Sequence, residues 1–151
     1  LVVAAGSGLT AAGLALGLKA RGRRTRVHVV SVQQLSSRIA DWIVEVAGRT
    51  ATHLGLATRL HRADFDVSGD QISPGYGKPS PASLEALVLA ARTEALVLDP
   101  AYTGKAMAGL IGRARAGGFG PRATVGFLHS GGTPGVFVHA KAIASASGRS
   151  P

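Results

Sequence analysis

The chain has 151 residues, 46% of them hydrophobic and 17% charged, a composition that fits one globular domain and not a disordered segment. The absence of cysteine excludes disulfides, thiolate metal ligands and a cysteine nucleophile. A formal charge of +9 suggests anionic partners, but aromatic residues make up only 5% and none lies among the dense arginines of residues 21–26. We therefore expect no nucleic-acid partner, and the short apolar runs predict no membrane association.

The first residues read as the interior of a buried strand. The sequence begins LVVAA, without an initiating methionine, so we expect a piece of a longer protein whose missing N-terminal segment carries further groups of the site. No signal-peptide pattern is visible, and the lack of cysteine suits a cytoplasmic protein.

A small-residue loop follows this strand at Gly6, Ser7, Gly8, Leu9 and Thr10 and leads into an apolar helix. Such a transition directs backbone N–H groups and the positive end of the helix dipole at one point. Gly6 and Gly8 let the backbone approach an oxyanion, and the hydroxyls of Ser7 and Thr10 can donate to it. The spacing is neither a Walker loop nor a full dinucleotide motif, so it predicts a small phosphorylated cofactor. A turn required only by packing is the alternative.

Strands and helices alternate along the rest of the chain. We expect further strands at 26–32, 65–67, 95–98 and 124–128, and helices at 39–46 and 49–60, from Pro81, and around Met107. Ser80 is expected to cap the helix that starts at Pro81. The alternation predicts an α/β fold with a three-layer, mostly parallel sheet and helices on both faces. We expect one domain over 1–139 and a flexible tail over 140–151.

Three loops rich in Gly, Ser and Thr follow predicted strands, at 6–10, 99–104 and 129–133. Because ligands bind beyond the carboxyl ends of the strands in such sheets, these loops predict one site. His129 borders it, but a structural role is the simpler interpretation, and the other histidines are too scattered to predict a metal site. Trp42 is predicted to be core. Ser7 lacks the Gly-x-Ser-x-Gly setting of a serine hydrolase.

Five segments carry a resemblance to a known family: AGSGLTAAGL (5–14), PGYG (74–77), ARTE (91–94), LDPAYTGKAMAG (98–109) and HSGG (129–132). In this order they resemble the fold type II pyridoxal-phosphate enzymes, specifically the D-cysteine desulfhydrase and 1-aminocyclopropane-1-carboxylate deaminase family. The resemblance spans residues 1–138 and implies the C-terminal part of such an enzyme's large domain. It also implies a pyridoxal 5'-phosphate cofactor, a small amino-acid substrate and a homodimer.

The resemblance also implies roles for particular residues. The loop of Gly6, Ser7, Gly8, Leu9 and Thr10 would hold the cofactor phosphate. Tyr76 and Tyr102 would be active-site tyrosines that face the substrate and the cofactor. Thr103 and Ser130 match the two positions that separate the activities, since the deaminases have Glu and Leu there and the desulfhydrases have hydroxyl residues.

The Thr103 and Ser130 pair has a physical meaning. A carboxylate beside the pyridine nitrogen keeps that nitrogen protonated and strengthens the ring as an electron sink, whereas a hydroxyl supplies no charge. Elimination of hydrosulfide needs less of this sink than opening a cyclopropane. Two hydroxyls therefore imply β-elimination on D-cysteine, to pyruvate, sulfide and ammonia, with the deaminase as the alternative.

Three features depart from the family pattern. Leu9 stands where the family usually has Gly, and an unusual backbone conformation there would make it crowd the phosphate. Ala11 stands where the desulfhydrases often have His. The lysine that anchors the cofactor lies in the family's N-terminal part and has no equivalent here, because Lys105 is better interpreted as structural. A catalytically silent, anion-binding fragment is therefore a further alternative.

Overall fold

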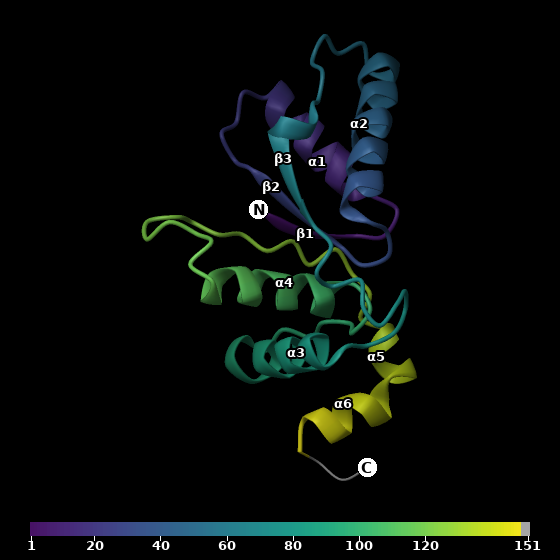
Figure 1. The fold of residues 1–151 in the computed structure, drawn as a ribbon, viewed down its shortest axis with the longest axis vertical. Coiled ribbons are helices and arrows are strands. Elements are labelled where there is room, and N and C mark those ends of the chain that lie inside the picture. Colours follow the sequence, from purple (N-terminus) through teal and green to yellow (C-terminus); the bar gives the residue numbers. More distant parts are fainter. Residues whose placement is uncertain (149–151) are drawn as a thin grey trace.

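The computed structural model describes residues 1–148 of the chain and contains a small sheet flanked by helices (Figure 1). The sheet holds three strands; two helices lie between consecutive strands, and the other four follow the last strand. The elements in chain order are β1 (Val2–Ala5), α1 (Leu9–Ala20), β2 (Val27–Ser31), α2 (Ser36–His53), a 3₁₀ turn (Arg62–Asp64), β3 (Phe65–Ser68), α3 (Pro81–Glu94), α4 (Thr103–Arg115), α5 (Gly135–Val138) and α6 (Ala140–Ala146).

All three strands are parallel and are ordered β1-β2-β3. Val2 pairs with His28 across the first ladder, and Val27 pairs with Phe65 across the second. β1 and β2 are nearly continuous apolar runs because both faces of the sheet are covered, whereas the edge strand β3 is half polar. Their parallel arrangement brings the carboxyl ends of all three strands to one edge.

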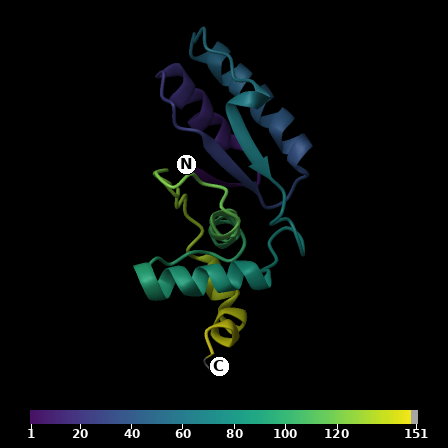
Figure 2. The same ribbon diagram turned by 60° about the vertical axis from the view of Figure 1, so that its left-hand side comes forward.

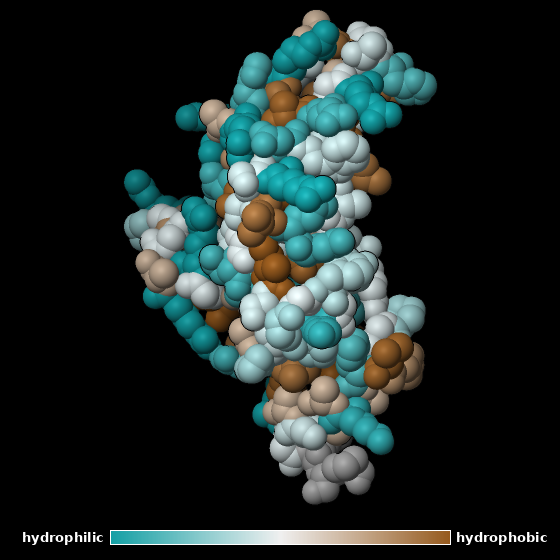
Figure 3. Space-filling model, turned by 45° about the vertical axis from the view of Figure 1, so that its right-hand side comes forward, coloured by the Kyte–Doolittle hydropathy of each residue, from teal (hydrophilic) through white to brown (hydrophobic). Residues whose placement is uncertain are grey.

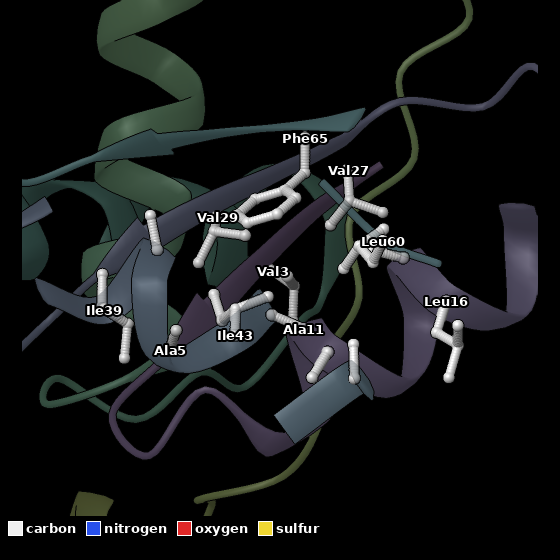
Figure 4. Packing of buried hydrophobic residues seen from close by; sticks show 14 of the residues in the cluster. Val3, Ala5, Ala11, Leu16, Val27, Val29, Ile39, Ile43, Leu60 and Phe65 are labelled. Carbon is white, nitrogen blue, oxygen red and sulfur yellow. The ribbon is translucent and has the colours of Figure 1, made fainter. Parts of the chain in front are cut away.

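Helices cover the two faces of the sheet in separate layers (Figures 1 and 2). On one face α1 and α2 pack over β1, β2 and β3, and Val3, Val29 and Ile43 point into the shared core (Figure 4). On the other face α4 packs through Ala106 against Val30, and α3 packs on α4. The predicted α/β class, the parallel sheet and the helices on both faces are confirmed.

Local signals explain two of the helices. Ser80 caps α3 by accepting a hydrogen bond from the Ser83 amide at 3.0 Å, with Pro81 in the first turn, as predicted. Helix α2 is longer than predicted and continues through Gly48 to His53, because Ala47 and Ala51 extend its buried stripe. The separate helix predicted at 49–60 is therefore wrong.

The strands predicted at 95–98 and 124–128 are not strands in the structure. Residues 124–128 run beside β1, but the amide of Val2 donates to Gly126 and that of Leu128 to Val2 around a single bridge between Val2 and Phe127. Residues 95–98 have no ladder; Leu98 is buried, whereas Val97 is 51% exposed. Apolar content predicted two strands where the structure has one isolated bridge at Phe127 and no ladder.

The end of the chain also differs from the expected tail. Residues 140–146 form α6, which packs against α3, and Arg92 donates to the Ser147 carbonyl at 2.7 Å. Residues 149–151 of the predicted tail lie outside the described residues. The domain boundary predicted at residue 139 stays a prediction.

The surface is largely polar, with apolar side chains exposed in several separate places (Figure 3). Phe137 and Val138 are more than four-fifths exposed, and Leu54 on the α2 side is 61% exposed. None of the helices within residues 1–148 has the length and hydropathy needed to cross a membrane.

Candidate functional site

A cavity of about 660 Å³ lies beyond the carboxyl ends of β1 and β2. Its walls come from the turn after β1, the turn after β2, one side of α2, the loop before α3, the start of α4 and the loop before α5. The lining residues are Ala4, Ala5, Gly6, Ser7, Gly8, Thr10, Gln33, Gln34, Trp42, Tyr76, Tyr102, Ser130, Gly131 and Gly132. The edge rule for parallel sheets thus predicted the position of the cavity.

The turn after β1 leaves the start of α1 without a cap. Gly8 precedes the helix in the left-handed conformation, with φ +78°, and no side chain caps the helix. Within residues 1–148, no group accepts hydrogen bonds from the amides of Leu9, Thr10 and Ala11. Three N–H groups at the positive end of the helix dipole are therefore free to bind an anion.

Both glycines of this turn are required by close contacts. A Cβ atom on Gly8 would lie 3.1 Å from side-chain atoms of Ile39 and Ile43, and one on Gly6 would lie 3.1 Å from the ring of Tyr102. The positive φ of Gly8 independently favours glycine. The turn can pack against α2 and Tyr102 only because these two positions lack side chains.

Two side chains bind the carbonyl groups of the same turn. The indole N–H of Trp42 donates to the Ser7 carbonyl at 2.9 Å, and the Gln34 amide donates to the Gly6 carbonyl at 3.4 Å. With these carbonyls occupied, the polar groups that remain in the turn are mostly donors. The sequence interpretation of Trp42 as core is incomplete, because the ring lines the cavity and holds the turn.

Sequence reasoning also missed Gln33 and Gln34, although a signal was present. Both residues lie just after β2, separated from it only by Val32, so the edge rule that selected the loop after β1 applied equally to them. They were overlooked because a Gln pair carries no motif.

Tyr76 and Tyr102 meet at the cavity. Their rings are perpendicular, with an interplanar angle of 80° and centroids 5.8 Å apart, and their hydroxyls share a hydrogen bond. That hydrogen bond, together with burial, raises the pKa of Tyr102 to about 12. Tyr102 therefore keeps its proton at neutral pH and can donate it in a hydrogen bond.

Thr103 follows Tyr102 but does not line the cavity. Its side chain is completely buried, and its hydroxyl donates to the Asp99 carboxylate at 2.7 Å while accepting from the Asp99 amide at 2.9 Å. The same carboxylate also accepts from the amides of Ala101, Tyr102 and Thr103 at 2.8 Å each. Asp99 thus organises the start of α4.

The loop before α5 completes the cavity through Ser130, Gly131 and Gly132. A Cβ atom on Gly132 would lie 2.5 Å from the Asp99 carboxylate, so this loop packs directly on the start of α4. His129 does not line the cavity. Its Nε2 lies 2.9 Å from the Val97 carbonyl, and its Nδ1 accepts from the Gly131 amide, which agrees with the structural role expected for it.

Leu9 does not crowd the cavity. It is the first residue of α1, its φ is not positive, and its side chain is 56% exposed beside Trp42 and Val46 on the outer surface. The departure from the family pattern at this position therefore leaves the turn open. Of the nine residues assigned to the site from the sequence, Leu9 and Thr103 do not line the cavity, and their roles in binding stay predictions.

Lys105 has a structural environment. Its side chain is fully buried and its ammonium donates to the carbonyls of Ile72, Ser73 and Gly75. Burial lowers the pKa of Lys105. The ammonium is not among the groups that line the cavity, which supports the structural interpretation made from the sequence.

The donor set fits a phosphate ester of moderate size. Free amides at the start of α1, the exposed hydroxyls of Ser7 and Thr10 and the absence of a carboxylate from the lining suit a dianion. A cavity of about 660 Å³ is large enough for a substituted pyridine ring with a small substrate. Within residues 1–148, no three His, Asp or Glu side chains gather as metal ligands.

Comparison with known proteins agrees with this geometry. The family model described as pyridoxal-phosphate dependent enzyme matches residues 1–131, so the chain belongs to that family. Among its relatives, a 1-aminocyclopropane-1-carboxylate deaminase of Burkholderia ambifaria is 35% identical over 141 residues. A D-cysteine desulfhydrase of Yersinia enterocolitica is 37% identical over 139 residues.

A solved structure is similar over nearly the whole chain. The crystal structure of an ACC deaminase homologue superposes with a TM-score of 0.84 and 30% identity, covering 96% of this chain and 43% of that one. The two relatives are likewise covered over 42% of their length, against 93% and 92% of this chain. The predicted family and fold are confirmed, and the chain spans less than half the length of the curated relatives it matches.

Proposed function

We propose that this chain is the C-terminal part of a pyridoxal-phosphate-dependent lyase that eliminates hydrosulfide from D-cysteine or a related small amino acid. Pyruvate, sulfide and ammonia would be the products. The observation that carries the proposal is the cavity in which the uncapped start of α1 meets Tyr76, Tyr102 and Ser130. The chain would supply the phosphate-binding side of the active site.

The phosphate would be held by groups that are already in place. The amides of Leu9, Thr10 and Ala11 point from a helix start whose turn is fixed by Trp42 and Gly8, so binding requires little reorganisation. When bound, the cofactor supplies an electron sink that stabilises negative charge at the substrate α-carbon. The protein's part is to orient the ring and the substrate.

The two tyrosines would act as neutral hydrogen-bonding groups and not as bases. A pKa of about 12 keeps the Tyr102 hydroxyl protonated at neutral pH. Tyr76 is 53% exposed and lies at the mouth of the cavity, where it can contact an entering substrate. Together they would orient the substrate against the ring and limit the access of water.

The choice of D-cysteine rests on Thr103 and Ser130. Identities of 35% and 37% to a deaminase and a desulfhydrase do not separate the two activities, whereas hydroxyl residues at both positions favour elimination. The Thr103 hydroxyl proton is donated to Asp99, so its oxygen can only accept from a further partner and adds no charge. The deaminase remains the alternative within the same enzyme class.

A second candidate is a unit that binds an anion without catalysing a reaction. The residues lining the cavity within the described part of the chain include no lysine, and the Lys105 ammonium is committed to three carbonyls. Borohydride reduction of the chain with pyridoxal phosphate should therefore leave no specific lysine adduct. A stoichiometric adduct at Lys105 would overturn the structural role of that residue.

Cofactor binding by the chain can be measured directly, because Trp42 is the only tryptophan and lines the cavity. Quenching of its fluorescence should show that pyridoxal phosphate binds with at least tenfold higher affinity than pyridoxal, which lacks the phosphate. Thr10→Val should weaken pyridoxal phosphate about fivefold, corresponding to about 1 kcal/mol, and leave pyridoxal unchanged. Thr52→Val, at an exposed position of α2, is the matched control. Equal affinity for the two compounds would contradict the proposal.

The reaction is tested on the complete enzyme. It should release sulfide and pyruvate from D-cysteine faster than 2-oxobutyrate from 1-aminocyclopropane-1-carboxylate. The reverse preference would defeat the argument from Thr103 and Ser130 and favour the deaminase.

A further inference from the structure

Lys105 is a buried cation whose binding partners are all backbone carbonyls. Its side chain has no exposed surface, and its Nζ lies 3.3, 3.2 and 3.1 Å from the carbonyl oxygens of Ile72, Ser73 and Gly75. Burying an ammonium without a carboxylate partner is energetically costly. Here the cost is offset by hydrogen bonds, because each of the three N–H donors of the ammonium can meet one of the three carbonyls.

The three carbonyls belong to the tight turn that leads to Tyr76. The Gly75 amide donates to the Ile72 carbonyl at 2.8 Å, the Ser73–Pro74 peptide is cis, and Gly75 has φ +136°. This turn has no regular secondary structure and packs against the start of α4. Without the ammonium, the Ser73 carbonyl would have no donor among residues 1–148.

Lys105 and Tyr102 lie on the same rigid element. Tyr102 directly precedes α4 and Lys105 stands in its first turn, so their separation is set by the helix and by the bonds to Asp99. The ammonium ties the turn of residues 72–75 to this element, and the next residue, Tyr76, then meets the Tyr102 hydroxyl. Tyr102 in turn packs on Gly6 of the turn that follows β1.

We infer that Lys105 is a positioning residue, which clamps the turn at 72–75 to the start of α4 and so holds Tyr76 against Tyr102 at the cavity. An apolar side chain of the same length would fill the space but leave the Ser73 carbonyl without a donor, and the Ile72 and Gly75 carbonyls with only their bonds from the amides of Gly75 and Lys78. The inference rests on the proposed function only for the role of the two tyrosines, because the clamp can be measured without any ligand.

The test uses the fact that Tyr76 and Tyr102 are the only tyrosines in the chain. In the wild-type chain with labelled lysine and tyrosine, NMR should show a Lys105 ammonium protected from exchange and a nuclear Overhauser effect between the two rings. In Lys105→Met the inter-ring effect should be lost, and amide exchange at residues 72–76 should accelerate at least tenfold. Amides of β1, β2 and β3 should exchange as before.

Lys19→Met is the matched control, since it removes an ammonium that pairs with Asp64 at 2.6 Å, away from the cavity. It should leave the tyrosine contact intact. If Lys105→Met does not fold, Lys105→Gln, which keeps two N–H donors, should weaken the inter-ring effect without abolishing it. A Lys105 ammonium that exchanges freely in the wild type, or an unchanged inter-ring effect in a folded variant, would overturn the inference.

The failure of this inference and that of the proposed function give different results. Loss of pyridoxal phosphate binding in the wild type with an intact tyrosine pair would count against the cofactor alone. Binding of pyridoxal phosphate with an unchanged tyrosine pair in Lys105→Met would count against the clamp alone.

Discussion

The helices α1 and α4 both begin at the cavity, but the first amides of α4 have an acceptor within the chain and those of α1 do not. At α4 the Asp99 carboxylate accepts from the amides of Tyr102 and Thr103, so the helix start is neutralised by the chain itself. At α1 no side chain caps the helix, and Gly8, the residue before it, has no side chain that could accept a hydrogen bond. Both helix starts border the cavity, but only the start of α1 keeps amides without a partner in the described chain, so only α1 can offer them to a ligand.

Removal of the internal cap should have the largest effect. Asp99→Ala leaves three buried or partly buried amides and the Thr103 hydroxyl without an acceptor, which should lower the free energy of unfolding by about 4 kcal/mol in urea denaturation. Asp99→Asn keeps one accepting oxygen and should cost about half as much. Asp41→Ala, which removes an exposed ion pair with Arg62, should cost less than about 1 kcal/mol. A similar small loss in Asp99→Ala would mean that the α4 start is not held by its carboxylate.

A side chain at Gly8 tests the open start. Gly8→Ala places a methyl group 3.1 Å from Ile39 and Ile43 in a left-handed conformation and should destabilise the chain by about 2 kcal/mol, measured by thermal unfolding. Gly13→Ala, inside α1 with open space around it, should instead stabilise by about 1 kcal/mol. Stability changes of opposite sign for Gly8→Ala and Gly13→Ala would show that glycine is required at the turn and not in the helix. Equal changes in stability would contradict a specific requirement for glycine at position 8.

The tyrosine pair beside the α4 start gives a pH-dependent effect. In the folded chain the pKa of Tyr102 is raised from 10 to about 12, so its contribution to stability is fully present below pH 10 and lost as the pH rises through 12. Tyr76→Phe removes the main cause, and the pKa of Tyr102 should fall toward 10 in a tyrosinate absorbance titration. No shift in this variant would show that the hydroxyl contact does not form in solution.

The smallest effect is expected from Trp42→Phe. The variant loses the hydrogen bond to the Ser7 carbonyl, which borders solvent, and should cost about 1 kcal/mol of stability. Its affinity for pyridoxal phosphate, measured by calorimetry, should fall more than its affinity for pyridoxal, because the turn that presents the α1 amides is loosened. Equal losses of affinity for both compounds would show that Trp42 supports the packing of the cavity wall and has no specific effect on the phosphate.

The α1 side of the molecule was largely predictable from the sequence. Apolar runs predicted β1 and β2, the alternation of Phe65 and Val67 with Asp66 fits the short strand β3, and small residues after β1 predicted the turn with Gly6 and Gly8. These signals are local, because each depends on a few neighbouring residues. The exception is α2, where two separate helices were expected over 39–46 and 49–60; Gly48 lies between these ranges but faces open space, and the helix continues through it.

The α4 side was predicted less well, because its organisation depends on contacts between distant residues. Nothing in the composition of residues 124–128 indicates that they pair with β1 through a single bridge at Phe127. The hydroxyl of Thr103 was expected to face the cofactor, but it is satisfied by Asp99 four residues earlier. Trp42 was assigned to the core by its helical spacing, which cannot reveal a hydrogen bond to Ser7.

The cavity joins residues 6–10 with residues 130–132, near opposite ends of the described chain. Within this chain the sheet and the helices α1 and α2 are synthesised before the residues from α3 onward, and their contacts can form while those later residues are still being made. The walls contributed by Tyr102 and Ser130 arrive much later. A chain that is cut by a protease or halted before residue 130 would therefore keep the sheet but lack part of the cavity wall, so ligand binding reports that the polypeptide extends through the loop at 130–132.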